Sequence, residues 1–151
     1  STPTVTIDLP LPAYIPTTFV NETSLRIQLY RRLAELEDMP SIDEMEAELL
    51  DRFGDLPRAI KGLLFQLRVK LLAQAANVTA IGSENGQIAI RLPYLSGVDR
   101  PGLQARLGHD VRVSRTAIWL SHETPEETIW QRSLLDVLEK LQVDQIQTAT
   151  S

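Results

Sequence analysis

The chain has 151 residues, of which 43% are hydrophobic and 23% charged, and its formal net charge is −5. A chain of this length and composition is predicted to fold as about one globular domain rather than to remain disordered. The acidic balance disfavours a free-standing nucleic-acid-binding protein, and the absence of cysteine excludes disulfide scaffolds, thiolate zinc sites and cysteine nucleophiles.

Residues 1–20 are predicted to form an extended, proline-rich segment. Val5, Ile7 and Leu9 alternate as in a short strand, and three prolines between residues 10 and 16 then keep the chain extended. We expect this segment to act as an arm or linker, with Phe19 or Val20 as a docked hydrophobic residue.

Three amphipathic helices are predicted next. Leucines at helical spacing place the first over residues 21–37. Pro40 is expected to break the chain, and the second and third helices are expected over residues 41–54 and 57–72. Short joints between them indicate a helical subdomain.

After Asn77 the hydrophobic period changes to two, which is typical of strands. Strands over 78–81 and 87–92 flank an Asn-Gly pair, the strongest short hairpin signal. A short helix over 101–107 leads to a third strand over 111–120. The candidate inward positions of that strand are Val111, Val113, Ile118 and Leu120.

Two capping boxes are predicted, since a side chain three residues into a helix can satisfy the free N–H at its start. One pairs Ser41 with Glu44, and the other pairs Thr124 with Glu127, with Pro125 at the first helical position. The second box opens a closing helix, and residues 143–151 are expected to fray.

These elements predict an α+β fold. It comprises a three-helix amino-terminal subdomain, a small three-stranded antiparallel sheet with a short helical insert, and a closing carboxy-terminal helix. We expect a single domain over residues 21–142. No apolar run approaches the ~20 residues of a membrane span and no signal-peptide pattern is visible, so a cytoplasmic location is expected.

Signatures of catalysis are absent. The sequence contains neither a P-loop nor a G-x-G-x-x-G motif, and His109 and His122 lack a second histidine at metal-ligand spacing. We therefore expect no cofactor, no metal and no enzymatic activity. Trp119 and Trp130 lie in apolar-periodic stretches and are predicted to belong to the core rather than to stack on bases.

Acidic charge is concentrated in one segment. The segment from Glu35 to Asp55 contains nine acidic residues and a single basic residue, Arg52. A solvated helix face explains such a run, and acids near a helix start are favoured by its dipole. The alternative is a docking surface, because acidic residues at three- and four-residue steps can accept pairs of hydrogen bonds from a partner's arginines. The residues that would form this surface are Glu44, Glu48, Asp51, Arg52 and Asp55.

Two stretches carry a family resemblance. Leu29–Ala34 reads LYRRLA and Glu48–Pro57 reads ELLDRFGDLP, and together they closely resemble the signature of the C-terminal domain of bacterial transcription-repair coupling factors. The resemblance covers residues 5 to about 92 well and the remainder more loosely.

This resemblance implies a non-catalytic regulatory module of an ATP-dependent DNA translocase. In that family the parent protein removes stalled RNA polymerase from DNA and recruits the repair protein UvrA. The C-terminal domain docks on the UvrB-like amino-terminal module of the same protein and hides its UvrA-binding surface. The family's docking positions correspond to Glu48, Asp51 and Arg52 here. Phe53 is expected in the core, and Tyr30, Arg31 and Arg32 in packing and salt bridges.

Two alternatives remain. One is a nucleic-acid-contacting accessory domain of the same translocase, with a discontinuous basic face formed by Arg26, Arg31, Arg32, Arg58, Lys61, Arg68 and Lys70. The other is an enzyme with an unrecognised site. A pocket holding a carboxyl with a strongly raised pKa would support that alternative.

Overall fold

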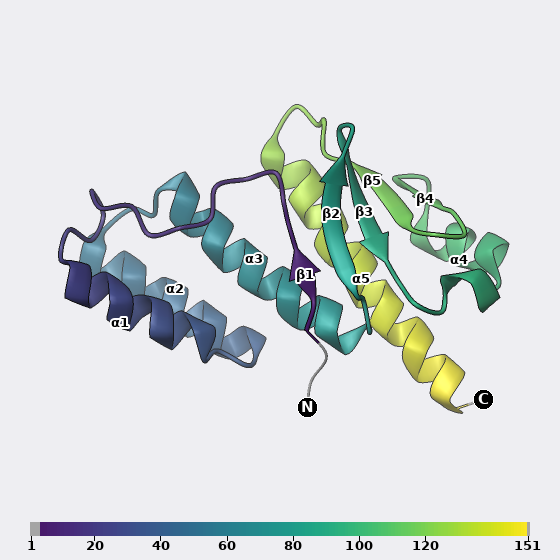
Figure 1. Cartoon of the computed structure of the whole chain (residues 1–151), viewed down its shortest axis with the longest axis horizontal. Helices are drawn as coiled ribbons and strands as arrows, with labels where there is room; N and C mark the ends of the chain where they lie inside the picture. The colour runs from purple at the N-terminus through teal and green to yellow at the C-terminus, as the bar shows by residue number, and fades with distance from the viewer. Residues whose placement is uncertain (1–3, 151) are drawn as a thin grey trace. The chain divides into compact units, whose positions relative to one another are not determined.

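The computed structural model describes the backbone of residues 4–150 and the side chains of residues 4–142. The described residues form two compact units, one of residues 11–71 and the other of residues 4–10 with 72–150. The described residues form the helices α1 to α5 and the strands β1 to β5, which are labelled in Figure 1. The prediction of an α+β fold is confirmed.

The unit of residues 11–71 is helical. It contains α1 (Thr23–Ala34), α2 (Met39–Phe53) and most of α3 (Arg58–Ala75). Its core is built from one apolar stripe of each helix, as the leucine spacing predicts. The fully buried members of that core are Leu29, Ile42, Leu49, Ile60 and Leu64.

The proline-rich segment packs against these helices. Ile15 and Val20 are buried in the helical core, and Phe19 packs against it. The N–H of Tyr14 donates to the carbonyl of Ala59 at the start of α3. An added Cβ at Gly62 would overlap the Pro12 carbonyl oxygen, so the backbone of the segment lies directly on α3. Residues 11–20 are therefore a strap on the helical unit, and the predicted docking of Phe19 and Val20 is confirmed.

The helix starts differ from the predicted capping boxes. Helix α2 begins at Met39, because the Asp38 carboxylate accepts a hydrogen bond from the Ser41 N–H at 2.8 Å. Pro40 lies in its first turn, where the missing N–H costs nothing, and so does not break the chain.

Helix α5 (Glu127–Thr150) begins two residues after Pro125, so the prediction of Pro125 at its first helical position is wrong. The Thr124 hydroxyl instead donates to the Glu126 carbonyl at 2.7 Å.

The second unit is built on a five-stranded mixed sheet of order β1-β2-β3-β5-β4. Its strands are β1 (Thr6–Ile7), β2 (Ala80–Glu84), β3 (Gln87–Arg91), β4 (Val111–Val113) and β5 (Ile118–Ser121). The β2–β3 turn is Asn85–Gly86, both at positive φ (50° and 80°), as the Asn-Gly signal predicts.

The predicted three-stranded sheet is too small. Residues 6–7 pair parallel with β2, a contact across more than 70 residues that local pattern does not indicate. The third predicted strand is two antiparallel strands, β4 and β5, because the Ser114 hydroxyl accepts from the Ala117 N–H and donates to the Ala117 carbonyl and so closes a turn.

Helices complete this unit. Helix α5 crosses one face of the sheet (Figure 1) and buries Trp130, Leu134 and Leu138. A single 3-10 turn, η1 (Leu95–Gly97), precedes α4 (Arg100–Leu107), which packs beside β4. The predicted fraying of 143–151 concerns side chains outside the described residues and, at Ser151, the backbone as well; it stays a prediction, as do the predicted domain boundaries.

Candidate functional site

The middle of the acidic segment is tied to α1 by an ion-pair network. Glu48 on α2 accepts two hydrogen bonds from the Arg32 guanidinium, at 2.6 and 2.7 Å. It accepts a third from Arg52, one turn further along, at 2.9 Å. We call Arg32, Glu48 and Arg52 the clasp. It joins the two sequence stretches that carry the family resemblance.

The clasp stabilises the charged form of its carboxylate. The hydrogen bonds from Arg32 and then Arg52 lower the pKa of Glu48 from 4.5 to about 2. The same hydrogen bond raises the pKa of Arg32. All three side chains keep solvent access, with 47% of Arg32, 32% of Glu48 and 41% of Arg52 exposed. The predicted salt-bridge role of Arg32 is confirmed.

The opposite edge of α2 is tied to α3. Arg68 donates to Asp43 at 2.7 Å and reaches Glu46 at 3.5 Å, with only 19% of its side chain exposed. Its spacing from these acids, 25 and 22 residues, leaves no local sequence signal for the pairing. Ion pairs therefore hold α2 on both flanks.

Between those flanks α2 presents an outward face. Glu44, Ala47 and Asp51 fall at three- and four-residue steps opposite the buried positions Ile42, Met45 and Leu49, and all three are exposed. Leu50 lies beside them and is 50% exposed, so it adds apolar area to this face. We call Glu44, Ala47, Leu50 and Asp51 the α2 outer face.

The predicted docking residues are thus divided between two settings. Glu44 and Asp51 lie on the α2 outer face and form no ion pair with any described residue, whereas Glu48 and Arg52 are engaged in the clasp. Asp55 follows Gly54, whose φ of 90° ends the helix, and is exposed. Sequence reasoning missed the internal partner of Glu48 and the exposed Leu50.

The basic face of the nucleic-acid alternative is partly neutralised. Within the helical unit, Arg32 and Arg68 are paired with carboxylates, and Arg26 donates to the Val20 carbonyl at 2.8 Å. Arg31 remains exposed without an ion pair to another described residue. The set does not form a continuous free basic surface.

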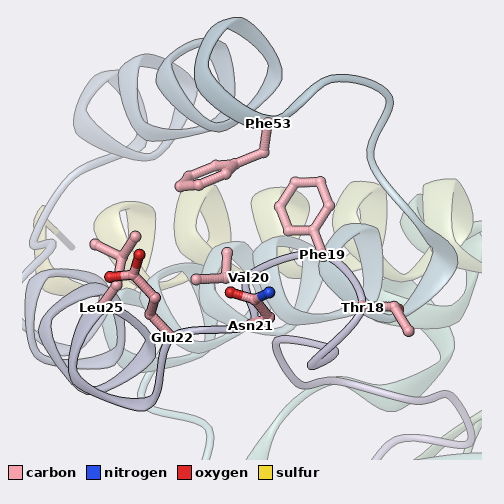
Figure 2. A pocket seen from close by; sticks show the side chains of 7 residues that line it. All are labelled: Thr18, Phe19, Val20, Asn21, Glu22, Leu25 and Phe53. Atoms are coloured by element: carbon pink, nitrogen blue, oxygen red, sulfur yellow. The ribbon is translucent and has the colours of Figure 1, made fainter.

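A shallow pocket of about 300 Å³ lies at the end of α2. Figure 2 shows Phe19 and Phe53 projecting toward it from the strap and from α2, with ring centroids 5.3 Å apart. The Arg52 guanidinium lies 5.0 Å from the Phe53 ring centre, which connects the pocket to the clasp. Phe53 is packed against the core but also lines a surface pocket.

Other candidate groups lie outside this region. His122 contacts the Ser83 hydroxyl at 3.2 Å and His109 is exposed in a turn. Trp130 is 3% exposed, as predicted for the core, whereas Trp119 is half-buried. The described residues contain no cluster of three potential metal ligands, and no described helix is long and apolar enough to cross a membrane.

The family model for the TRCF domain matches residues 9–101. The chain belongs to the TRCF domain family. This match includes the strap, the clasp and the α2 outer face, and it confirms the resemblance drawn from the two short stretches.

Among similar proteins are the transcription-repair-coupling factors of Haemophilus influenzae, 38% identical over 84 residues and 54% of this chain, and of Rickettsia bellii, 34% identical over 86 residues and 57% of this chain. The same factor from Staphylococcus haemolyticus is 32% identical over 90 residues, 60% of this chain. These matches cover only 7–8% of the relatives' length. This chain is therefore similar to one small part of a much longer protein.

The fold is shared with a solved structure. The crystal structure of the C-terminal domain of a transcription-repair coupling factor superimposes with a TM-score of 0.73, covering 94% of this chain and 96% of that one at 17% identity. The likeness therefore extends past the region matched by the TRCF family model, into β4, β5 and α5.

Proposed function

We propose that this chain is an autoinhibitory docking module of a transcription-repair coupling factor. It binds the UvrB-like module of the same protein and covers the surface that recruits UvrA. Membership of the TRCF family supports the identity of the parent, and the α2 outer face supports the mode of contact.

The single observation that carries this proposal is the pairing pattern on α2. Ion pairs on both flanks fix the helix, while Asp51, on the face between them, forms no ion pair with any residue that the structure describes. A carboxylate held on a rigid element gains more from an incoming arginine than a mobile one, because less side-chain freedom is lost. Leu50 beside it supplies apolar area that a partner can bury.

The members of the site then have different tasks. Asp51 and Glu44 are the carboxylates available to a basic partner, and Asp55 extends the acidic surface past the helix end. Glu48 already accepts three hydrogen bonds, so it positions Arg52 rather than offering a free acceptor. Arg52 can in turn donate to an acid of the partner.

The proposal is tested by calorimetric titration of this chain into the separately expressed UvrB-like module at two salt concentrations. We expect binding that weakens with salt. Asp51→Arg should raise Kd at least roughly 30-fold, about 2 kcal/mol, because charge reversal places two cations against each other.

The matched control is Glu139→Arg, the same type of charge reversal at an exposed position of α5. It should leave Kd unchanged. An equal rise of Kd in both variants would show that the total charge of the chain, and not the α2 outer face, controls docking. Asp51→Arg is preferable to Glu48→Arg, since the latter would place a third guanidinium inside the clasp.

A further inference from the structure

The open face of the five-stranded sheet carries an unusual group of residues. Side chains at paired positions share a face, and the pairs Ala80↔Arg91, Gly82↔Ala89, Ala89↔Trp119 and Arg112↔Trp119 place six residues together. The isoleucines at the alternate positions point to the buried face. We call Ala80, Gly82, Ala89, Arg91, Arg112 and Trp119 the sheet patch.

Two arginines converge on one indole in this patch. The Arg91 and Arg112 guanidinium carbons lie 5.7 and 5.5 Å from the Trp119 ring centre. They come from β3 and β4, the two strands that flank β5. The Trp119 N–H donates to the Ser114 hydroxyl at 3.2 Å, which fixes the ring. Cation–π attraction thus holds two like charges near each other.

The local charge is positive although the chain is acidic. Arg91 has one carboxylate partner, Glu84 at 3.2 Å, and also donates to the Thr116 carbonyl at 3.3 Å. Exposed Arg112 has no ion pair with a described residue, and neither does exposed Arg115, adjacent to Thr116 in the β4–β5 turn. Two guanidiniums, those of Arg91 and Arg112, therefore lie over one indole, Glu84 pairs with Arg91 alone among them, and Arg115 follows in the adjoining turn. An anionic partner would relieve the repulsion between these positive charges.

The shape of the patch indicates the class of anion. Its small residues leave no bulky side chain between β2 and β3. Ala89 is buried, with 1% of its surface exposed, whereas a Cβ added at Gly82 would meet nothing within 4 Å, so the surface is open at Gly82. None of the large exposed hydrophobic residues of the described chain belongs to it. A protein partner would gain little there, because protein interfaces depend on large apolar anchors in pockets.

We propose that the sheet patch binds single-stranded nucleic acid. Phosphates pair with Arg91, Arg112 and Arg115, and unstacked bases lie against the Trp119 edge and the arginine planes above Gly82. Flat basic surfaces with planar side chains suit such strands, since every base offers a π-face. This site is separate in sequence and residues from the α2 outer face, and it does not depend on the docking function.

Fluorescence anisotropy of a labelled oligothymidylate tests the proposal. A length of about 12 nucleotides lies within the usual ~4–16 nucleotide site size. Titrations at about 50 and about 200 mM salt should show weakening, with a log–log slope of about −2 if three phosphates are neutralised. Arg112→Glu should weaken binding about tenfold and make the slope shallower by about 0.7.

Arg115→Glu, in an exposed turn, provides a second variant with little risk to folding. We expect it to lose about as much affinity for the oligonucleotide as Arg112→Glu does. The matched control is Arg31→Glu. Arg31 is exposed on α1, forms no ion pair with a described residue, and belongs to the basic set considered from sequence. It should bind as the unchanged chain does. Circular dichroism verifies that each variant folds.

Three outcomes would overturn the proposal. They are the absence of salt-dependent binding, an equal loss of affinity in Arg31→Glu, and full affinity in both Arg112→Glu and Arg115→Glu. Displacement of the oligonucleotide by poly-glutamate at equal charge concentration would assign the patch to acidic proteins instead. The calorimetric titration into the UvrB-like module measures a different site. Its result therefore does not depend on whether the oligonucleotide binds.

Discussion

At the scale of single residues, Glu48 shows how one side chain can serve two helices. Its carboxylate accepts from Arg32 on α1 and from Arg52 one turn away on α2, so it orders both the α1–α2 contact and the guanidinium beside Phe53. Exposed ion pairs contribute little singly, about 0.2–1 kcal/mol each. The bidentate geometry places the clasp toward the upper end of that range.

The clasp makes stability depend on pH. Because the folded pKa of Glu48, about 2, lies below the unfolded value of 4.5, its contribution is complete above pH 4.5 and is lost as pH falls toward 2. We expect Glu48→Gln to lower the free energy of unfolding by about 1 kcal/mol at neutral pH, and by much less near pH 2. Urea denaturation at both pH values measures the difference.

Glu44→Gln is the control for this measurement, since Glu44 is exposed on the same helix without an ion pair to a described residue. Its stability should equal that of the unchanged chain at both pH values. A Glu48→Gln deficit that stays constant down to pH 2 would contradict the ion-pair explanation and indicate a packing effect.

At the scale of elements, the strap depends on one glycine of α3. Glycine inside a helix costs about 1 kcal/mol relative to alanine, so Gly62 needs a structural reason. That reason is the close approach of Pro12 and Leu11, which a methyl group would displace. The strap in turn brings Ile15 and Val20 into the helical core.

Gly62→Ala should therefore destabilise the chain by about 2 kcal/mol, because overlap with backbone outweighs the gain in helix propensity. Gly97→Ala is the comparison, as an added Cβ there meets nothing within 4 Å. Thermal unfolding of both variants measures this difference in stability. Stabilisation by Gly62→Ala would mean that the strap does not lie on α3 in solution.

At the scale of the whole molecule, docking is expected to be intramolecular. In the proposed docking, the tethered partner is present at an effective concentration of about millimolar, so we expect weak contacts at the α2 outer face to populate a closed state. Release then requires only that another ligand favour the open state. The separated chain has no tether and should bind its partner more weakly than the intact factor does.

In the intact coupling factor, Asp51→Arg should increase UvrA binding by opening the closed state. The measurement is co-purification of UvrA with the intact factor, with Glu139→Arg as the comparison. Unchanged UvrA binding in Asp51→Arg, together with normal folding, would show that the α2 outer face does not cover the UvrA surface.

Much of the fold could be predicted because its signals are local. The period of Leu29, Leu33, Met45 and Leu49 identifies helices, and Asn85–Gly86 permits the positive φ of a tight hairpin turn. The β4–β5 division was missed, since Ser114 makes its turn without glycine or proline. The start of α2 was missed because Asp38, and not Ser41, supplies the cap.

The candidate site was predicted only in part. Spacing placed Glu44 and Asp51 on one helix face, and exposure agrees with that placement. The same reasoning assigned Glu48 to a partner, although Arg32 occupies it from 16 residues away. Trp119 looked like core because its neighbours alternate, but its position on the open face follows from pairing with Arg112.

The sequence by itself therefore determined the helices, the hairpin, the TRCF family and the location of the acidic segment, since each is encoded in residues close along the chain. Only the tertiary structure decided which charges are satisfied internally and which remain free. It also brought Thr6–Ile7 to β2 and gathered Arg91, Arg112 and Trp119 from three strands. The physical reason is that ion pairs and strand pairs join residues by distance in space, which periodicity along the chain does not record.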